Sequence, residues 1–508
     1  MRTPLLFLSG LALVAAGCGG GTSGASQGYA PAPPDPGHHR PTVAPWPELD
    51  ATPYDGVTHE DPGVNPYVDP DEDQVSTFGL DVDTASYTIA QRYVDDGYRP
   101  DPASVRVEEW VNAFDQGYRS SDDAAFTILA DGGPTPFTEA DEVLLRVGLQ
   151  AQDVRDRARE DAALTFVIDT SGSMEREGRL ELVKDALRLL VDELGRNDTV
   201  AIVTFGDDAG VVLEPTRAAD AGHILRVIDR LRPSGSTNLE AGLRLGYDLA
   251  RASLTENGID RVVLASDGVA NVGLTDPESI LDAIRRDAQA GIELISVGVG
   301  MGNFNDTLLE QLANQGDGFY AYVNALDEAR RLFTEDLTGT LQTVALDARA
   351  QVEFDRDVVA AYRLVGYENR DIDDDDFTDE EVDAGAIGAG HAVTALYALR
   401  LREDVGFQDQ LATVRLRWTD PDNGAVDELT RAIRTSDLAR SFEASDPHFR
   451  FDAIVAATAE VLRDSPWTER LDLAAVADVA AREELGLPET DEVHGFLDLL
   501  DRLTSMDG

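Results

Sequence analysis

Residues 165–174 read TFVIDTSGSM, an apolar run that breaks into one acid and then hydroxyls spaced two residues apart. Similar apolar runs follow as TVAIVTF (199–205), RVVLASD (261–267) and GIELISVGVG (291–300), and segments with helical spacing separate them. Near-continuous apolar strands that alternate with helices are typical of a mostly parallel sheet with both faces covered. We therefore predict a doubly wound, Rossmann-like α/β domain over residues 160–340.

Three loops of this domain carry oxygen-bearing side chains after a strand or just before a helix. They are DTSGS (169–173), SGSTN (234–238) and SDG (266–268). In a doubly wound sheet, the loops at the carboxyl ends of the strands converge on one edge, where ligands bind. The loops offer two carboxylates and several hydroxyls without thiol or imidazole, which suits a hard cation, Mg²⁺ above all, with Mn²⁺ or Ca²⁺ as alternatives. Ordinary strand-end caps and turns use the same residue types, so a purely local role also stays open.

These loops resemble the metal-ion-dependent adhesion site of von Willebrand factor type A domains, and all five positions of that pattern are present. The resemblance implies that Asp169, Ser171, Ser173 and Thr237 lie at or near the ion. It implies that Asp267 acts through a bound water. It also implies that a Glu or Asp carboxylate of a protein partner completes the coordination of the ion.

Segments outside the α/β domain carry a second resemblance. FGLDVDTASYTIAQRYVDDG (78–97), VRVEEWVNAFD (105–115), the segment that begins YENRDIDDDDF (367–399) and FLDLLDRL (496–503) are similar to YfbK-like bacterial von Willebrand A lipoproteins. The likeness runs from about Val75 to the end of the chain. Because the biochemical role of that family is poorly defined, the resemblance informs the architecture more than the function.

The flanking regions predict β-rich structure on both sides of the α/β domain. Residues 75–155 begin with a strand-like segment and two helices, and then include the strand candidates AFTILA (125–130) and VLLRVGLQA (143–151). Residues 345–445 alternate in a way that predicts an antiparallel β-sandwich, and residues 446–508 predict a helical tail. One arrangement consistent with this pattern places the early and late strands in one sheet system, with the α/β domain inserted between them.

The net charge of the chain limits the classes of partner that it can bind. The 508 residues include 96 acidic and 42 basic side chains, for a net charge of -54. Such a field repels nucleic acid, so we expect no nucleic-acid partner. The acidic run DIDDDDFTDEEVD (371–383) lacks the Gly and Glu positions of an EF-hand, and we expect a solvated loop there.

The N-terminus has the features of an export signal. A positively charged residue and the apolar run LLFLSGLALVAA precede the sequence AAGC, which ends at Cys18, the only cysteine in the chain. This ending resembles the lipobox of bacterial lipoproteins, in which the cysteine is lipidated. We predict a lipoprotein signal peptide over residues 1–18 and a Gly/Pro-rich tether over residues 19–74. We expect a lipid-anchored protein of the bacterial cell envelope, and Gly19, which is not an Asp-type retention signal, favours the outer membrane.

Taken together, these features predict a membrane-anchored, divalent-cation-dependent protein-binding protein that acts in adhesion or assembly and is not an enzyme. Two alternatives stay open: an assembly module in which the metal is purely structural, and a metal-dependent hydrolase. A hydrolase would need Ser171 or Ser173 as nucleophile and a base beside it. None of the seven histidines falls in the three loops. We therefore assign no catalytic residue.

Overall fold

The computed structural model describes most of the chain from Gly63 onward, and residues Thr52–Gly508 make one compact unit. The predicted signal peptide, Cys18 and the tether up to residue 62 lie outside the described residues. The described residues are 63–80, 82, 84–121, 124–138, 142–154, 160–255, 258–267, 277–288, 290–300, 306–323, 325–330, 332–333, 341–368, 370, 372–378, 385–421, 423–483 and 486–507.

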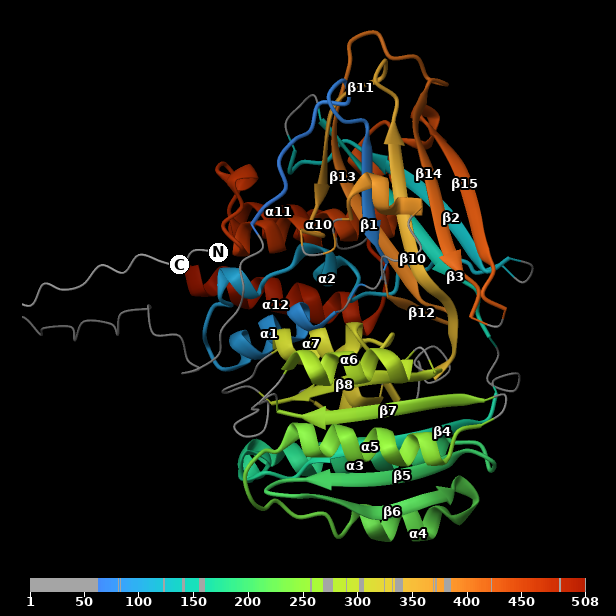
Figure 1. Ribbon diagram of the computed structural model, residues 1–508. Coiled ribbons are helices and arrows are strands. Elements are labelled where there is room, and N and C mark those ends of the chain that lie inside the picture. Colours follow the sequence, from blue (N-terminus) through green and yellow to red (C-terminus); the bar gives the residue numbers. More distant parts are fainter. Residues whose placement is uncertain are drawn as a thin grey trace, which may run out of the picture. The chain divides into compact units, whose positions relative to one another are not determined.

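A six-stranded sheet with the order β6-β5-β4-β7-β8-β9 forms the centre of the α/β domain (Figure 1). All neighbours pair in parallel except β5 and β6, which are antiparallel. Strands β6 and β9 were not expected; β6 is a largely exposed edge strand that contains a proline, a residue tolerated at sheet edges. The strands are β4 (Ala162–Asp169), β5 (Thr199–Phe205), β6 (Ala209–Arg217), β7 (Ile259–Ser266), β8 (Ile292–Val299) and β9 (Tyr320–Val323).

Helices cover both faces of this sheet. Helices α3 (Arg179–Glu193), α4 (Ala221–Ile228) and α8 (Leu326–Arg330) share one apolar core with the sheet. Helices α5 (Leu239–Ala252), α6 (Pro277–Ala288) and α7 (Asp306–Asn314) share a separate core on the other face. The sheet is therefore buried on both sides, which confirms the predicted doubly wound fold and explains why its central strands are apolar along their whole length.

Two antiparallel sheets form a sandwich from strands that come before and after the α/β domain (Figure 1). One sheet has the order β11-β13-β3-β2 and the other the order β1-β10-β14-β15, with β12 also paired to β10. Because β3 lies between β13 and β2, and β1 pairs with β10, the α/β domain is inserted between the parts of one sandwich. The strands are β1 (Val75–Gly79), β2 (Phe126–Gly133), β3 (Glu142–Ala151), β10 (Thr343–Phe354), β11 (Val359–Val365), β12 (Ala386–Gly388), β13 (Ala392–Leu401), β14 (Gln410–Thr419) and β15 (Val426–Arg434).

The C-terminal helices pack with two helices from the N-terminal region. Helices α10 (Pro447–Leu462), α11 (Leu473–Glu483) and α12 (Asp491–Asp507) share an apolar core with α1 (Ala85–Asp95) and α2 (Val107–Val111). The three C-terminal helices lie within residues 446–508, where a helical tail was predicted. Within the described residues no helix is long and apolar enough to cross a membrane.

Helix α1 joins the C-terminal helices to the α/β domain because it is buried on two faces. Tyr87 and Val94 pack into the core formed with the C-terminal helices, whereas Ile89 and Tyr93 pack into the α/β core beside α5 and α7. An 11-residue helix that is apolar on two sides cannot be stable in solution by itself and needs both neighbours. The α/β domain therefore has a core that is completed by a helix from outside its own sequence.

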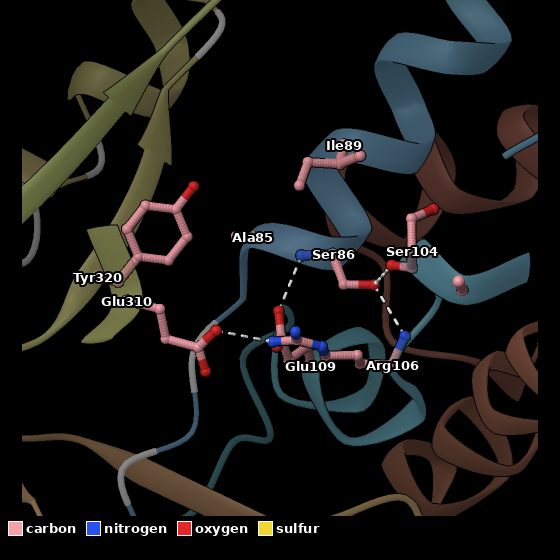
Figure 2. Close-up of a pocket in the computed structure, with 9 residues that line it drawn as sticks. Ala85, Ser86, Ile89, Ser104, Arg106, Glu109, Glu310 and Tyr320 are labelled. Atoms are coloured by element: carbon pink, nitrogen blue, oxygen red, sulfur yellow. Dashed lines mark hydrogen bonds and ion pairs between the residues drawn. The ribbon is translucent and has the colours of Figure 1, made fainter. Parts of the chain in front are cut away.

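An ion-pair cluster lies at this junction (Figure 2). Glu310 of α7 accepts a hydrogen bond from Arg106 Nη1 at 3.1 Å, and its other oxygen lies 3.5 Å from Arg370 Nη2. Arg106 also contacts Glu109, whose carboxylate accepts a hydrogen bond from the Ser86 backbone N–H. Arg106, Glu109 and Glu310 line a small pocket between α1, α2 and α7, and the ion pairs tie the α/β domain to both of its flanks.

Residues 63–74, which we expected to belong to the tether, lie against the sandwich. Val68 forms an antiparallel bridge with Tyr362 of β11. The Asn65 side-chain amide donates hydrogen bonds to two backbone carbonyls at the end of β11 and just after it, at 3.3 and 2.8 Å. The ordered body therefore begins before the first strand. In the acidic run, residues Asp374–Thr378 form one short 3-10 helix, and residues 379–384 lie outside the described part of the chain.

Candidate metal site

The first candidate loop begins where β4 ends. Strand β4 is buried throughout, so its last residue, Asp169, is carried into the interior and has no exposed surface. Asp169 Oδ1 accepts a hydrogen bond from the Ser171 backbone N–H at 2.7 Å, which folds the loop back over the carboxylate. The Ser171 and Ser173 hydroxyls are hydrogen-bonded to each other, with their oxygens 2.9 Å apart. One buried carboxylate and two hydroxyls therefore lie within a single turn of chain.

Backbone hydrogen bonds join the second loop to the first. The Gly172 N–H donates to the Gly235 carbonyl at 3.0 Å, and the Ser234 N–H donates to the Thr170 carbonyl at 2.5 Å. Thr237 lies on this second loop with only 2% of its surface exposed. The fold therefore holds the buried Thr237 on a loop that is bonded to the serine-bearing loop.

Local features of the second loop explain its shape. Gly235 has φ +83°, and a Cβ there would lie 2.8 Å from the Asp207 backbone nitrogen, so only glycine fits. The Asp207 carboxylate accepts hydrogen bonds from the Ser236 backbone and hydroxyl at 2.9 and 2.7 Å. Asn238 then caps helix α5 by accepting a hydrogen bond from the Ala241 N–H. The loop is thus held at both ends, by the neighbouring strand connection and by the helix.

The third loop reaches the first through side chains. Ser266 Oγ, at the end of β7, donates to Asp169 Oδ2 at 2.9 Å. Asp267 follows with no exposed surface, and its Oδ2 accepts a hydrogen bond from Arg179 Nη1 at 2.8 Å. Residues 268–276 lie outside the described part of the chain. All five predicted site residues therefore lie on loops that contact one another at one edge of the sheet.

Burial controls the charge state of Asp169. The loss of solvent raises the pKa of Asp169 to about 6, hydrogen bonds from Ser171 and Ser266 oppose the rise, and the nearby Asp267 adds to it. At neutral pH the carboxylate is ionised at a cost in free energy, because a buried charge is poorly solvated. A cation bound beside it would offset that cost.

The spacing of the hydroxyls fits a small hard cation. Adjacent ligands of an octahedral Mg²⁺, each about 2.1 Å from the ion, lie about 3.0 Å apart. The Ser171 and Ser173 hydroxyl oxygens are 2.9 Å apart. Ca²⁺, with bonds of about 2.3–2.6 Å and a flexible shell of six to eight oxygens, accepts a similar spacing, so the spacing is compatible with either ion. Throughout the described ranges no group of three or more His, Cys, Asp or Glu side chains could hold a metal, so hydroxyl ligands are central to this candidate site.

Arg179 and the Ser266 hydroxyl were absent from the residues that we expected to form the site. A signal for Arg179 was present in the sequence, because it is the first residue of α3, where the helix dipole disfavours a cation. A buried arginine at that position needs a carboxylate, and the structure supplies Asp267. Ser266 was not distinguishable from an ordinary strand-end serine without knowledge of its distance to Asp169.

Comparisons with known proteins agree with this architecture. The family model of the von Willebrand factor type A domain matches residues 163–335. A second family model, described as the C-terminal part of the uncharacterized protein YfbK, matches residues 339–506. A third, described as von Willebrand factor, matches residues 54–146. The uncharacterized protein YfbK of Escherichia coli K12 is 35% identical over 428 residues, which cover 79% of this chain and 73% of that protein. The chain belongs to the YfbK family.

Two further similarities cover parts of the chain. The uncharacterized protein sll0103 of Synechocystis is 27% identical over 56% of this chain and 68% of its own length. The solved structure of a von Willebrand factor type A protein from Catenulispora acidiphila covers 73% of this chain and 89% of its own, at 17% identity and a TM-score of 0.43. The type A domain of this YfbK-family chain contains all three candidate loops, and it suggests a module for protein–protein interaction.

Proposed function

We propose that this YfbK-family chain binds a divalent cation, Mg²⁺ first, through Asp169, Ser171, Ser173, Thr237 and Asp267. The bound ion would supply a Lewis-acidic position for a Glu or Asp carboxylate of a protein partner. The observation that carries the proposal is the pair of serine hydroxyls 2.9 Å apart above a buried carboxylate. Hydroxyl ligands leave the charge of a cation largely uncompensated, so an anionic ligand remains attracted to it.

Binding accounts for this arrangement better than catalysis does. A serine nucleophile requires a base within hydrogen-bond reach, most often a histidine. The described histidines belong to other elements: His223 to α4, His391 to the turn before β13, His448 to α10 and His494 to α12. Burial lowers the pKa of His391 to about 4, so that ring is uncharged at neutral pH. We therefore propose a binding protein for adhesion or assembly.

We also propose that the protein is held at the bacterial cell envelope, at the outer membrane, by lipid on Cys18. The support is the signal-like segment before the single cysteine and the long tether after it. More than one acyl chain gives stable membrane attachment without a spanning helix. Cys18→Ser should release the protein from membranes and abolish labelling by a palmitate analogue. An unchanged membrane fraction would contradict the anchor.

Calorimetric titration tests the metal site. The protein from Gly63 onward is titrated with Mg²⁺ and Mn²⁺ as wild type, as Asp169→Ala, and as Asp208→Ala, which removes an exposed acid from a neighbouring loop. We expect Asp169→Ala to lose binding and Asp208→Ala to keep it. Normal binding by Asp169→Ala would refute the site.

The same three proteins distinguish the alternative roles of a bound metal. Each is used to capture envelope proteins, in Mg²⁺ and in EDTA. A binding role predicts that capture by wild type is lost in EDTA and lost in Asp169→Ala. Capture that survives the loss of metal would favour a purely structural ion, and metal-dependent turnover of ester or phosphate substrates would favour a hydrolase.

A further inference from the structure

Arg179 places a buried positive charge beside the candidate metal site. Its side chain is 3% exposed, its Nη1 lies 2.8 Å from Asp267 Oδ2, and its Nη2 lies 3.6 Å from Glu177 Oε2 at the surface. Asp267 in turn lies close enough to Asp169 to influence it electrostatically. The guanidinium is thus separated from the candidate cation position by a single carboxylate.

The backbone around Arg179 leaves room for this side chain at two points. Gly178, the residue before it, has φ +72°, a conformation that lets α3 begin with the arginine turned inward. Gly300, at the end of β8, has φ +77°, and a Cβ there would overlap the Arg179 Nε and aliphatic chain. The arginine therefore passes directly against a backbone that only glycine keeps open.

Stability alone does not account for the buried pair. Taking two charges out of water costs about as much free energy as their attraction returns, so an apolar pair of the same size would serve the fold equally well. The position also opposes the dipole of α3. A buried arginine on Asp267 is better explained by its effect on the charge of the site.

The charge of the site can be counted from its three buried ionised groups. Asp169 and Asp267 contribute two negative charges, and Arg179 contributes one positive charge, which leaves one net negative charge. A divalent cation would convert this to one net positive charge. Without the arginine, the same cation would leave the site neutral. Glu177 is half exposed, so solvent screens its contribution.

We propose, building on the metal-binding function proposed above, that Arg179 is a positioning residue that keeps the cation-loaded site positively charged. It weakens the binding of the cation and strengthens the binding of the anionic partner group. A residue that only braced Asp267 would affect both in the same direction. Opposite changes in cation and carboxylate affinity are therefore the signature of the charge effect.

The test compares wild type with Arg179→Gln, Arg179→Lys and Arg176→Gln. Arg176 is exposed in the same loop and provides the same change of charge outside the buried site. Mn²⁺ affinity is measured by calorimetry. Carboxylate affinity is measured with acetate, from the broadening of its methyl proton signal by the Mn²⁺-loaded protein. We expect Arg179→Gln to bind Mn²⁺ at least about tenfold more tightly and acetate at least about tenfold more weakly, since the loss of a buried positive charge removes repulsion of the cation and attraction of the carboxylate in a poorly solvated site.

Each outcome has a distinct meaning. Arg179→Lys should stay near wild type in both affinities, and Arg176→Gln should change neither by more than about twofold. Weaker or unchanged Mn²⁺ binding by Arg179→Gln, while Asp169→Ala still abolishes it, would overturn the role of Arg179 and leave the metal site intact. Wild type that binds no Mn²⁺ would overturn the metal site itself. If Arg179→Gln does not fold, Arg179→Met, which removes the charge without burying a new polar group, should give the same two opposite changes, and weaker or unchanged Mn²⁺ binding by it would overturn the role of Arg179.

Discussion

Replacement of Asp169 with Asn tests whether the buried carboxylate is kept for metal rather than for stability. Asn preserves the shape of the side chain and the acceptor for the Ser171 N–H, and the Ser266 hydroxyl can rotate to accept from the new amide. Burial raises the pKa of Asp169 from 3.8 to about 6. The native state therefore binds the proton more tightly than the unfolded chain, and the metal-free protein loses stability as the pH rises through this window.

The size of this loss of stability follows from the shift in the pKa of Asp169. A difference of about 2 pKa units corresponds to about 3 kcal/mol once the pH exceeds both values, and to only about 0.5 kcal/mol at pH 4. In EDTA, Asp169→Asn should therefore be more stable than wild type by about 3 kcal/mol at pH 7.5, and the advantage should shrink as the pH falls. Wild type should recover about 2.7 kcal/mol when Mg²⁺ is present at about 100 times its Kd, and the variant should recover none.

Scanning calorimetry at pH 5, 6 and 7.5, in EDTA and in Mg²⁺, measures these differences. We expect the variant to melt higher than wild type in EDTA at pH 7.5 and to be insensitive to Mg²⁺. Asp208→Asn, an exposed change on a neighbouring loop, should follow wild type in every condition. A variant that is less stable than wild type in EDTA at pH 7.5, or that still gains stability from Mg²⁺, would refute the reasoning.

Three further outcomes follow from the packing. Gly300→Ala should destabilise the protein by at least about 1 kcal/mol more than Gly291→Ala, because both glycines have positive φ but only the first contacts a buried arginine; denaturant unfolding measures the difference. Glu310→Gln should cost about 1–3 kcal/mol, since it removes the charge between the buried Arg370 and the partly buried Arg106, whereas Glu240→Gln, in an exposed pair, should cost less than about 1 kcal/mol. The isolated fragment 160–340 should melt lower than the whole chain and bind a hydrophobic dye, because helix α1 no longer covers its face; equal melting temperatures would contradict the shared core.

The central strands were predictable because their apolar runs are unbroken. The segment LTFVID became β4, and the runs at 199–205 and 291–300 became β5 and β8 within a residue or two. Strands β6 and β15 were missed because they are exposed edge strands, in which polar and apolar residues mix without a clear period. The four-residue strand β9 is too short to give a periodic signal.

The amino-acid sequence by itself determined the doubly wound domain, the three oxygen-bearing loops and the residues that we propose bind a cation. These features depend on local spacing and on the rule that strand ends of a parallel sheet meet at one edge. The signal-like segment before Cys18 is also local, and it stays a prediction. A local pattern is readable without knowledge of the rest of the chain.

Only the tertiary structure decided how strands before and after the inserted domain pair in the sandwich. It also decided that the buried positive charge of Arg179 lies beside the candidate metal site. Thr77 of β1 pairs with Gln351 of β10, although the whole α/β domain lies between them in the sequence. Helix α1 completes the core of the α/β domain, although it precedes that domain in the sequence. Arg179 reaches Asp267 because Gly300, directly after β8, leaves space for the arginine side chain. Such contacts join residues far apart in sequence, and their distances are set by the packing of whole elements, which no local pattern encodes.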